Sequence, residues 1–350
     1  MKLNKVRGKR LGSVGARLLA LAGFLTLGGC GVVQHVIFKT TGDVLSLYAE
    51  KHQVPYVMGT DDLAMNCSMS EALTPLLMSF SRVTSTPNQL AVIVYSSAGI
   101  CAETQAWDEE LRYLRAVKKG NATEAQDAQI TQKRYQVLAA NRNYTSYLHL
   151  VEEFGEPGGE CPDLDGEFEN FVWMMGMIGG LQALSNEVSS GVGLGVPKNL
   201  IAKAERGAAC LDDDEFWGVP MAMRAMIWTM LPGTMPQGED PYARLRMASE
   251  KGEKAGVRLP HLLHAMAVMN QGDTEALKEV IRQHAKSKSI KPANPERKLL
   301  DAIATNALLG ISDRLWTEAT GHRTPTGGFG TFWDDKKANT GEVMSLDDIL

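Results

Sequence analysis

The chain has 350 residues, 44% of them hydrophobic, and a formal net charge of −5 at pH 7. Its first 29 residues contain six basic residues and no acidic ones, so the rest has 30 basic and 41 acidic residues and a charge of about −11. Such a chain is not expected to bind nucleic acid, because phosphate binding needs a basic surface. Its length is sufficient for one large core or two smaller ones.

Residues 1–29 have the features of a secretory signal peptide, with basic residues before a short apolar stretch from Leu18 to Leu27. That stretch is too short for a membrane-spanning helix, which needs about 20 residues. The ending "LGGC" resembles a bacterial lipobox, in which the peptide is cut before the cysteine and the thiol is acylated. Cys30 is therefore predicted to be a lipidated N-terminus. The alternative is an ordinary signal peptide, or a weak membrane anchor, with a chance cysteine.

The residue after Cys30 is Gly31 and not Asp, so the familiar signal for retention in the inner membrane is absent. The predicted location is therefore the periplasm, with the anchor in the outer membrane rather than the inner one. No later segment has 18 apolar residues in a row, so the lipid would be the attachment of the mature protein to the membrane.

The pattern of residues 30–60, a linker or first element, fits either a short strand or a helix. Residues 61–320 are predicted to form one helical domain. Three local patterns predict helix starts: Ser68-x-x-Glu71, Thr86-Pro87-x-Gln89 and Thr123-x-x-Gln126. Pro75 is expected to kink the first of these helices. The second and third are long and are joined by a few residues around Gly120, so they must lie antiparallel.

The segment "FENFVWMMGMIGGLQAL" is apolar on nearly all sides, which predicts a buried helix. Its glycines would let a neighbouring helix approach closely. Further helices are predicted over 198–210, 215–230, 242–256, 259–270, 274–286 and 295–320. The last four form helix–turn–helix units, which suggest a tetratricopeptide-like stack, although no full consensus repeat is present. The fold class is therefore all-α, with helical hairpins stacked as a bundle or solenoid.

Residues 321–350 are predicted to be a C-terminal extension. Trp316 and the Phe329-x-x-Phe332-Trp333 stretch are expected to dock its first part on the domain. The polar tail from Asp335 onward is expected to be mobile.

Four cysteines follow Cys30, and an even number in an oxidising compartment favours two disulfides. Cys67 lies 18 residues before Ser85, the centre of a predicted turn, and Cys101 lies 16 residues after it. In an antiparallel hairpin such residues lie at nearly the same height. Cys161 precedes the apolar helix and Cys210 ends the next one, so their thiols meet if these two helices are antiparallel. The predicted pairs are Cys67–Cys101 and Cys161–Cys210.

The stretch "DDLAMNCSMSEALTPLLMSFSRVTSTPNQLAVIVYSSAGICAE" resembles the T-component family of TRAP transporters. The likeness comprises the Asp-Asp opening, an Ala-Leu-x-Pro-Leu-Leu helix, a Pro-Asn turn and a helix rich in small residues and tyrosine. With a later "GVPMAMRAMIW" segment it extends over roughly residues 45–320. The resemblance implies a lipid-anchored periplasmic protein of cryptic tetratricopeptide repeats. It also implies a non-enzymatic partner of a solute-binding protein, with a homotrimer as one assembly and an internal apolar cleft for a hydrophobic solute.

Methionine and tryptophan recur at helical spacing between residues 217 and 230, around one arginine. A Met-rich surface adapts to variable apolar ligands, although an ordinary core is the commoner cause of such a pattern. If buried, Arg224 needs an anion, and a protein carboxylate is favoured over the head group of an acidic ligand. The predicted ligand-binding residues are Trp107, Tyr113, Trp173, Met177, Trp217, Met223, Arg224 and Trp228.

No catalytic set is recognisable. His261 and His264 are three residues apart, but no HExxH pattern accompanies them, and "SSGVGLGVPKN" lacks the spacing of a phosphate loop and is expected to be flexible. No enzyme activity, cofactor or metal is therefore predicted. The predicted function is binding of an apolar or amphipathic solute and its transfer to or from a solute-binding protein. The alternative is a structural lipoprotein that scaffolds an envelope assembly without a small ligand, and an enzyme ranks third.

Overall fold

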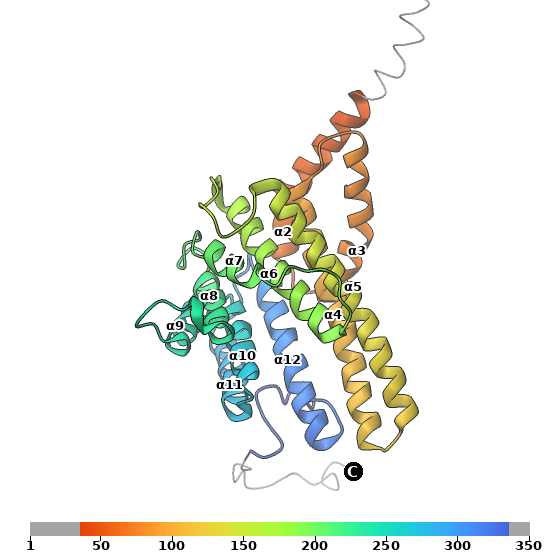
Figure 1. Cartoon of the computed structure of the whole chain (residues 1–350), viewed down its shortest axis with the longest axis vertical. Coiled ribbons are helices and arrows are strands. Elements are labelled where there is room, and N and C mark those ends of the chain that lie inside the picture. Colours follow the sequence, from red (N-terminus) through yellow and green to blue (C-terminus); the bar gives the residue numbers. More distant parts are fainter. Residues whose placement is uncertain (1–35, 336–350) are drawn as a thin grey trace, which may run out of the picture.

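The computed structural model describes residues 36–335, and every regular element in this range is helical (Figure 1). The predicted signal peptide, the lipidation site Cys30 and the tail beyond residue 335 lie outside this range. The all-α class predicted from the sequence is confirmed. A tetratricopeptide-like arrangement of the helices stays a prediction. None of the described helices is long and apolar enough to cross a membrane.

The described part of the N-terminal region is helical, which settles the choice between strand and helix. A helical segment over 36–48 continues into the π-helical turn η1 (Ala49–Gln53) and the short helix α2 (Val54–Met58). Pro55 has no N–H to give to the carbonyl of Lys51, which explains the wider hydrogen-bond spacing just before it.

The first half of the domain contains α3 (Leu63–Ser79), α4 (Asn88–Lys118), α5 (Ala122–Phe154) and α6 (Gly166–Ser190), with the short 3-10 helix η2 (Phe80–Arg82) after α3. Helices α4, α5 and α6 are the longest among the described residues. Helices α4 and α5 pack closely and are joined by three residues, which confirms that they form an antiparallel hairpin. Pro75 lies inside α3, which continues across it.

The predicted helix starts were wrong by up to two turns. The Asp62 carboxylate caps α3 by accepting the Met65 N–H at 2.8 Å, and the Asn121 side chain caps α5. Ser68 instead lies within α3, where its hydroxyl donates to the Ala64 carbonyl. Thr123 is the second residue of α5, and α4 begins after Pro87. In α3 and α5, an Asp or Asn side chain that precedes the predicted Ser or Thr accepts a hydrogen bond from one of the first free N–H groups of the helix. The helix therefore begins earlier than predicted.

Helix α6 is buried on most of its circumference, as its apolar sequence predicts. Its glycines allow α5 to lie very close: a Cβ at Gly180 would lie 2.8 Å from the Tyr147 ring, and one at Gly176 would overlap Leu150. This contact fixes the α4–α5 hairpin against the centre of the molecule.

The helices of the second half of the domain are shorter than α4, α5 and α6. They are α7 (Leu200–Ala208), α8 (Val219–Met230), η3 (Pro232–Thr234), α9 (Pro241–Ala255), α10 (Leu259–Gln271), α11 (Thr274–Ile290) and α12 (Lys298–Thr320). Helix α12 returns to the first half and packs against α2, α3 and α4, while its other side contacts α10 and α11 (Figure 1).

The described part of the C-terminal extension docks as predicted. The Trp316 indole N–H donates to the Thr331 carbonyl at 3.1 Å, and the Trp316 and Trp333 rings meet edge to face. Phe332 is 4% exposed within a cluster formed by α10, α11 and α12.

Both predicted disulfides are present. Cys67–Cys101 joins α3 to α4 with a Cα–Cα distance of 5.6 Å, and Cys161–Cys210 joins the loop before α6 to the end of α7 with a distance of 5.5 Å. Two such bonds are typical of proteins that fold in an oxidising compartment.

Candidate functional site

An apolar cavity lies where α2, α3, α4, α6 and α12 meet. Its cavity volume is about 50 Å³, and the surrounding empty space of about 570 Å³ includes open solvent. We call it the apolar cavity. Its lining residues are Gln53, Val54, Val57, Met58, Asn66, Met69, Ser70, Ile93, Val94, Ser97, Ile100, Phe171, Met175, Leu299, Leu300 and Ile303.

Helical periodicity explains how each wall is formed. Residues four apart lie on the same face of a helix. Ile93 and Ser97 therefore make one wall from α4, and Phe171 and Met175 make another from α6. Leu299 and Ile303 of α12 close the third side by the same spacing. The cavity thus depends on α12 returning to the N-terminal helices.

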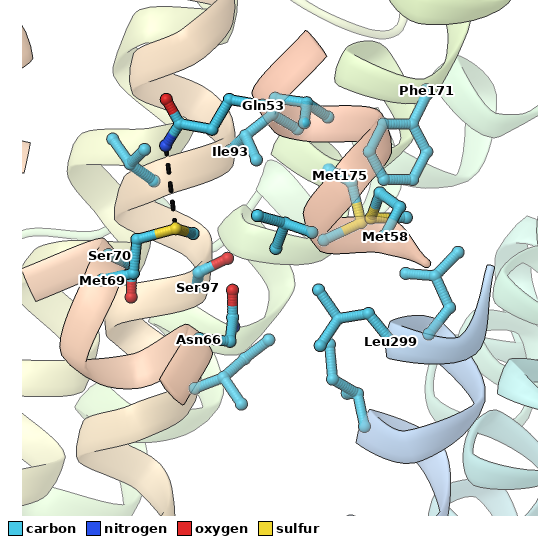
Figure 2. A pocket seen from close by; sticks show the side chains of 16 residues that line it. Gln53, Met58, Asn66, Met69, Ser70, Ile93, Ser97, Phe171, Met175 and Leu299 are labelled. Atoms are coloured by element: carbon cyan, nitrogen blue, oxygen red, sulfur yellow. Dashed lines mark hydrogen bonds between the residues drawn. The ribbon is translucent and has the colours of Figure 1, made fainter. Parts of the chain in front are cut away.

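The polar side chains of the cavity gather at one end. Figure 2 shows Asn66, Ser70 and Ser97 on one side and Met58 and Phe171 on the other. The Ser70 hydroxyl donates to the carbonyl of the residue three positions earlier at 3.1 Å. The Asn66 amide and the Ser97 hydroxyl, in contrast, have no protein hydrogen-bond partner among the described residues. This end can therefore hydrogen-bond a polar group of a ligand.

The lining contains no Asp, Glu, Lys, Arg or His side chain. A charged group placed deep in this cavity would lose its hydration without gaining a counter-ion, which is strongly unfavourable. The cavity therefore suits an uncharged apolar body that carries one hydrogen-bonding end.

Two structural features hold the polar end in place. The disulfide between Cys67 and Cys101 ties α3 to α4 directly beside the lining residues Asn66 and Ile100. The π-helical turn η1 supplies Gln53, whose amide contacts the Met69 sulfur at 3.7 Å (Figure 2). π-helical turns occur frequently at functional sites.

A second, polar pocket lies around Arg224 in α8. Its cavity volume is about 80 Å³, and it is lined by Asp213, Met221, Arg224, Trp228, Pro236, Glu239 and Arg244. One carboxylate oxygen of Glu205 accepts from both Arg224 Nε (3.1 Å) and Trp228 Nε1 (3.0 Å). The anion beside Arg224 is therefore a protein carboxylate, the favoured one of the two alternatives. Arg244 is likewise paired, through two 2.6 Å hydrogen bonds to Glu239.

The eight predicted ligand-binding residues do not share one cavity. Arg224 and Trp228 line the polar pocket, and none of the eight lines the apolar cavity. Met223 is fully buried in the core, and Trp217 lies half-buried with its ring 5.9 Å from the Arg297 guanidinium.

The remaining predicted residues lie on α4 and α6. Trp107 packs on Gly310 of α12, and Tyr113 is half-buried two turns further along α4. Trp173 and Met177 face α7, where the Trp173 indole N–H donates to the Gly207 carbonyl at 3.0 Å. They occupy the face of α6 opposite to the one that lines the apolar cavity. The i, i+4 spacing of Phe171 and Met175 is the sequence pattern from which the cavity-lining face of α6 could have been recognised.

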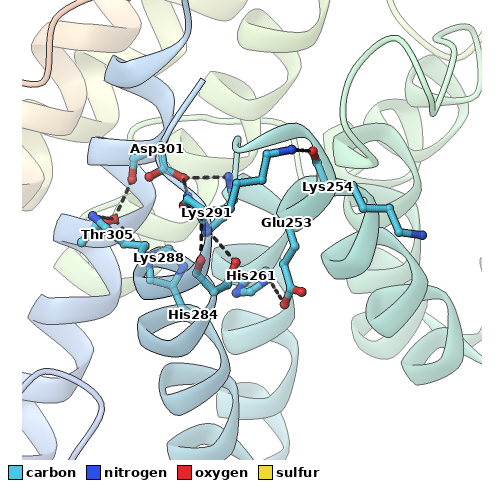
Figure 3. Close-up of polar contacts among 10 residues, drawn as sticks. Glu253, Lys254, His261, His284, Lys288, Lys291, Asp301 and Thr305 are labelled. Carbon is cyan, nitrogen blue, oxygen red and sulfur yellow. Dashed lines mark hydrogen bonds and ion pairs between the residues drawn. The ribbon is translucent and has the colours of Figure 1, made fainter. Parts of the chain in front are cut away.

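A buried polar cluster connects α10, α11 and α12 (Figure 3). Arg258 is 0% exposed, and its guanidinium donates to Asp301 at 2.8 Å and to the Ser287 hydroxyl at 2.7 Å. The His261 and His284 rings meet edge to face at 5.3 Å.

Burial lowers the pKa of His284 to about 2, so its imidazole is neutral near pH 7. Burial likewise lowers the pKa of His264 to about 4. Residues 36–335 contain no group of three or more acidic, histidine or cysteine side chains placed to hold a metal ion. His264 and His284 are thus buried, neutral groups of the core.

The loop over 191–197 is held by Glu187, at the end of α6. The Glu187 carboxylate accepts the N–H groups of Leu194 (2.9 Å), Gly195 (3.2 Å) and Val196 (2.9 Å). The loop predicted to be flexible is therefore fixed to α6 at one end by three hydrogen bonds.

Comparisons with protein-family models, with curated proteins and with solved structures found no match for this chain.

Proposed function

We propose that the protein binds a hydrophobic or amphipathic solute in the apolar cavity, as a lipid-anchored periplasmic protein that docks a TRAP-type solute-binding protein. The observation that supports solute binding is the uncharged lining, in which Asn66 and Ser97 are the polar side chains at one end that form no hydrogen bond to another described residue. Anchoring at Cys30 and docking rest on the lipobox and on the family resemblance.

The walls supply most of the binding free energy. Moving apolar surface out of water gives about 25 cal/mol per Å², so about 200 Å² of buried ligand surface gives about 5 kcal/mol before the cost of association. Asn66 and Ser97 contribute little to the affinity but orient the solute. A ligand without a hydrogen-bonding end would displace water from both side chains and leave them without a hydrogen-bond partner. The expected ligands are therefore apolar molecules with one hydroxyl, carbonyl or amide end.

The test fills the cavity from one wall. Ile93→Phe and Ser97→Leu place additional carbon atoms into it without adding charge, and Val117→Phe on the exposed end of α4 is the matched control. We expect the neutral fluorophore N-phenyl-1-naphthylamine to bind the wild-type and control proteins with equal affinity. It should bind both cavity variants about tenfold more weakly, which corresponds to a loss of about 1.4 kcal/mol in binding free energy. Circular dichroism establishes that all four proteins are folded.

Equal affinity of all four proteins would contradict binding in the cavity. Native mass spectrometry provides a second readout, because protein purified from its own membrane should carry a lipid-like molecule. A protein that is empty and whose melting temperature does not rise with apolar ligands would favour the alternative, a structural lipoprotein without a small ligand.

Docking has a separate test. A TRAP solute-binding protein from the same genome, ideally encoded beside this chain, should form a complex with it in analytical ultracentrifugation. No complex with any such protein would remove the transport part of the proposal and leave solute binding in place.

A further inference from the structure

The helical segment over 36–48 packs on the domain through a narrow face of small residues. Gly42 lies against the hairpin between α3 and α4, where an added Cβ would be 3.0 Å from the Thr84 methyl group. Ala49, two turns later on the same face, is 3% exposed. The Thr84 hydroxyl also donates to Asp43 beside this contact.

The opposite face of this segment is apolar and uncovered. A helix turns by about 100° per residue, so Val44 points almost directly away from Gly42. Ile37 and Tyr48 lie seven residues before and four residues after Val44 and share its face. Val36 and Leu47 flank them, and all five side chains are between 50% and 59% exposed. We call these five residues the outer face.

The outer face is unusual because a helix of a globular protein turns its apolar side toward the core. Here the small residues contact the domain and the large apolar ones do not. Figure 1 shows the segment extending beyond the helix bundle at the end where α2 and α3 lie. Apolar side chains in such a position are typical of a surface that contacts another apolar phase.

We propose that the outer face docks on the surface of a lipid bilayer. This inference rests on the proposed lipidation of Cys30, which would hold the acyl chains close to the segment. Cys30 and Val36 are six residues apart, so at most about 3.6 Å per residue, or about 20 Å, separates the anchor from the first residue of the outer face. A short amphipathic helix gains membrane affinity by burying its apolar side at the boundary between head groups and acyl chains.

Docking in this way also positions the apolar cavity. The segment continues without a break into η1 and α2, which contribute Gln53, Val57 and Met58 to the lining. A bilayer in contact with the outer face therefore lies next to the N-terminal wall of the cavity. A solute could then pass between the bilayer and the cavity over a short distance.

The test uses the full mature protein in vesicles of phosphatidylethanolamine and phosphatidylglycerol. A nitroxide label is attached at Leu47→Cys, in the outer face, or at Ile290→Cys, a control 73% exposed at the end of α11. We expect the Leu47 label to have a ratio of oxygen to nickel-chelate accessibility at least about fivefold higher than the Ile290 label, because oxygen concentrates in the bilayer and the chelate stays in water. Val44→Lys should move the Leu47 label back into water.

Equal nickel accessibility at both positions would overturn the proposal. A Leu47 label shielded from both reagents, with dipolar broadening, would also overturn it and indicate a second copy of the chain on this face. The mass of the N-terminal peptide reports separately whether Cys30 is acylated. A protein that is acylated but has a water-exposed Leu47 label contradicts membrane docking alone, whereas absence of the acyl group contradicts the proposed anchoring.

Discussion

At the scale of single residues, Glu103 is the most unusual ionisable group of the domain. It is buried between α4, α5 and α6, where the amides of Asn143 and Gln182 each donate to its carboxyl group at 3.2 Å and Asn186 donates as well. Burial raises the pKa of Glu103 from 4.5 to about 7, although the hydrogen bonds from Asn186 and Asn143 act in the opposite direction. The side-chain oxygen of Asn143 is buried without a hydrogen-bond partner.

The raised pKa predicts a pH dependence of stability. Between pH 4.5 and 7 the folded protein retains a proton on Glu103 that the unfolded chain releases, so this group stabilises the fold in acid and its contribution falls as the pH rises. Across this window the loss is about 3 kcal/mol. Glu103→Gln stays neutral at every pH. We therefore expect the difference in free energy of unfolding between Glu103→Gln and wild type to change in favour of the variant as the pH rises from 4 to 8. The change should reach at most about 3 kcal/mol.

Urea unfolding at several pH values measures this difference. The histidines with lowered pKa values destabilise both proteins equally in acid, so their effect cancels. Glu250→Gln, at an exposed position of α9, is the control and should show no such trend. A constant difference between Glu103→Gln and wild type would contradict the assignment.

At the scale of elements, local sequence signals predicted most of the fold. Hairpin geometry gave the right disulfide pairs, and the apolar sequence of α6 gave its burial. The apolar cavity could not be predicted in this way. Both faces of α6 are apolar, so the sequence does not show that Met175 lines the cavity and Met177 packs on α7. The third wall comes from Leu299 and Ile303, whose contact with α2 depends on the whole chain between them.

The two disulfides allow a matched pair of variants. Replacing either pair by alanine should lower the free energy of unfolding by about 2–4 kcal/mol, since both close loops of similar length. Only the loss of Cys67–Cys101 should also weaken binding of the fluorophore, because this bond lies beside the apolar cavity. Cys161–Cys210 is attached to the opposite side of α6. Equal loss of binding in both variants would show that the effect is general destabilisation.

At the scale of the whole molecule, the described residues form a major core, a smaller C-terminal core and a small cluster of Ala49, Leu77 and Leu90. The major core extends from α4 to α10 and includes Met58 of α2 and Leu299 and Ala304 in the first half of α12. The smaller core contains Leu308 and Trp316 from the second half of α12, together with Phe332. Helix α12 is thus shared between them, and its first half lines the apolar cavity.

This division predicts that the two cores lose stability separately. Phe332→Ala removes a ring that is 4% exposed and lies 5.1 Å from the Arg282 guanidinium, a change that typically costs about 3–5 kcal/mol. Hydrogen exchange should therefore show faster exchange in α11 and in the second half of α12. Amides of α5 and α6 should keep their protection, because opening of the smaller core leaves the major core packed. Phe38→Ala, at a position 48% exposed in the segment over 36–48, is the control and should change neither region. Equal loss of protection in both cores would mean that α12 couples them into one cooperative unit, and the apolar cavity would then also open when the C-terminus undocks.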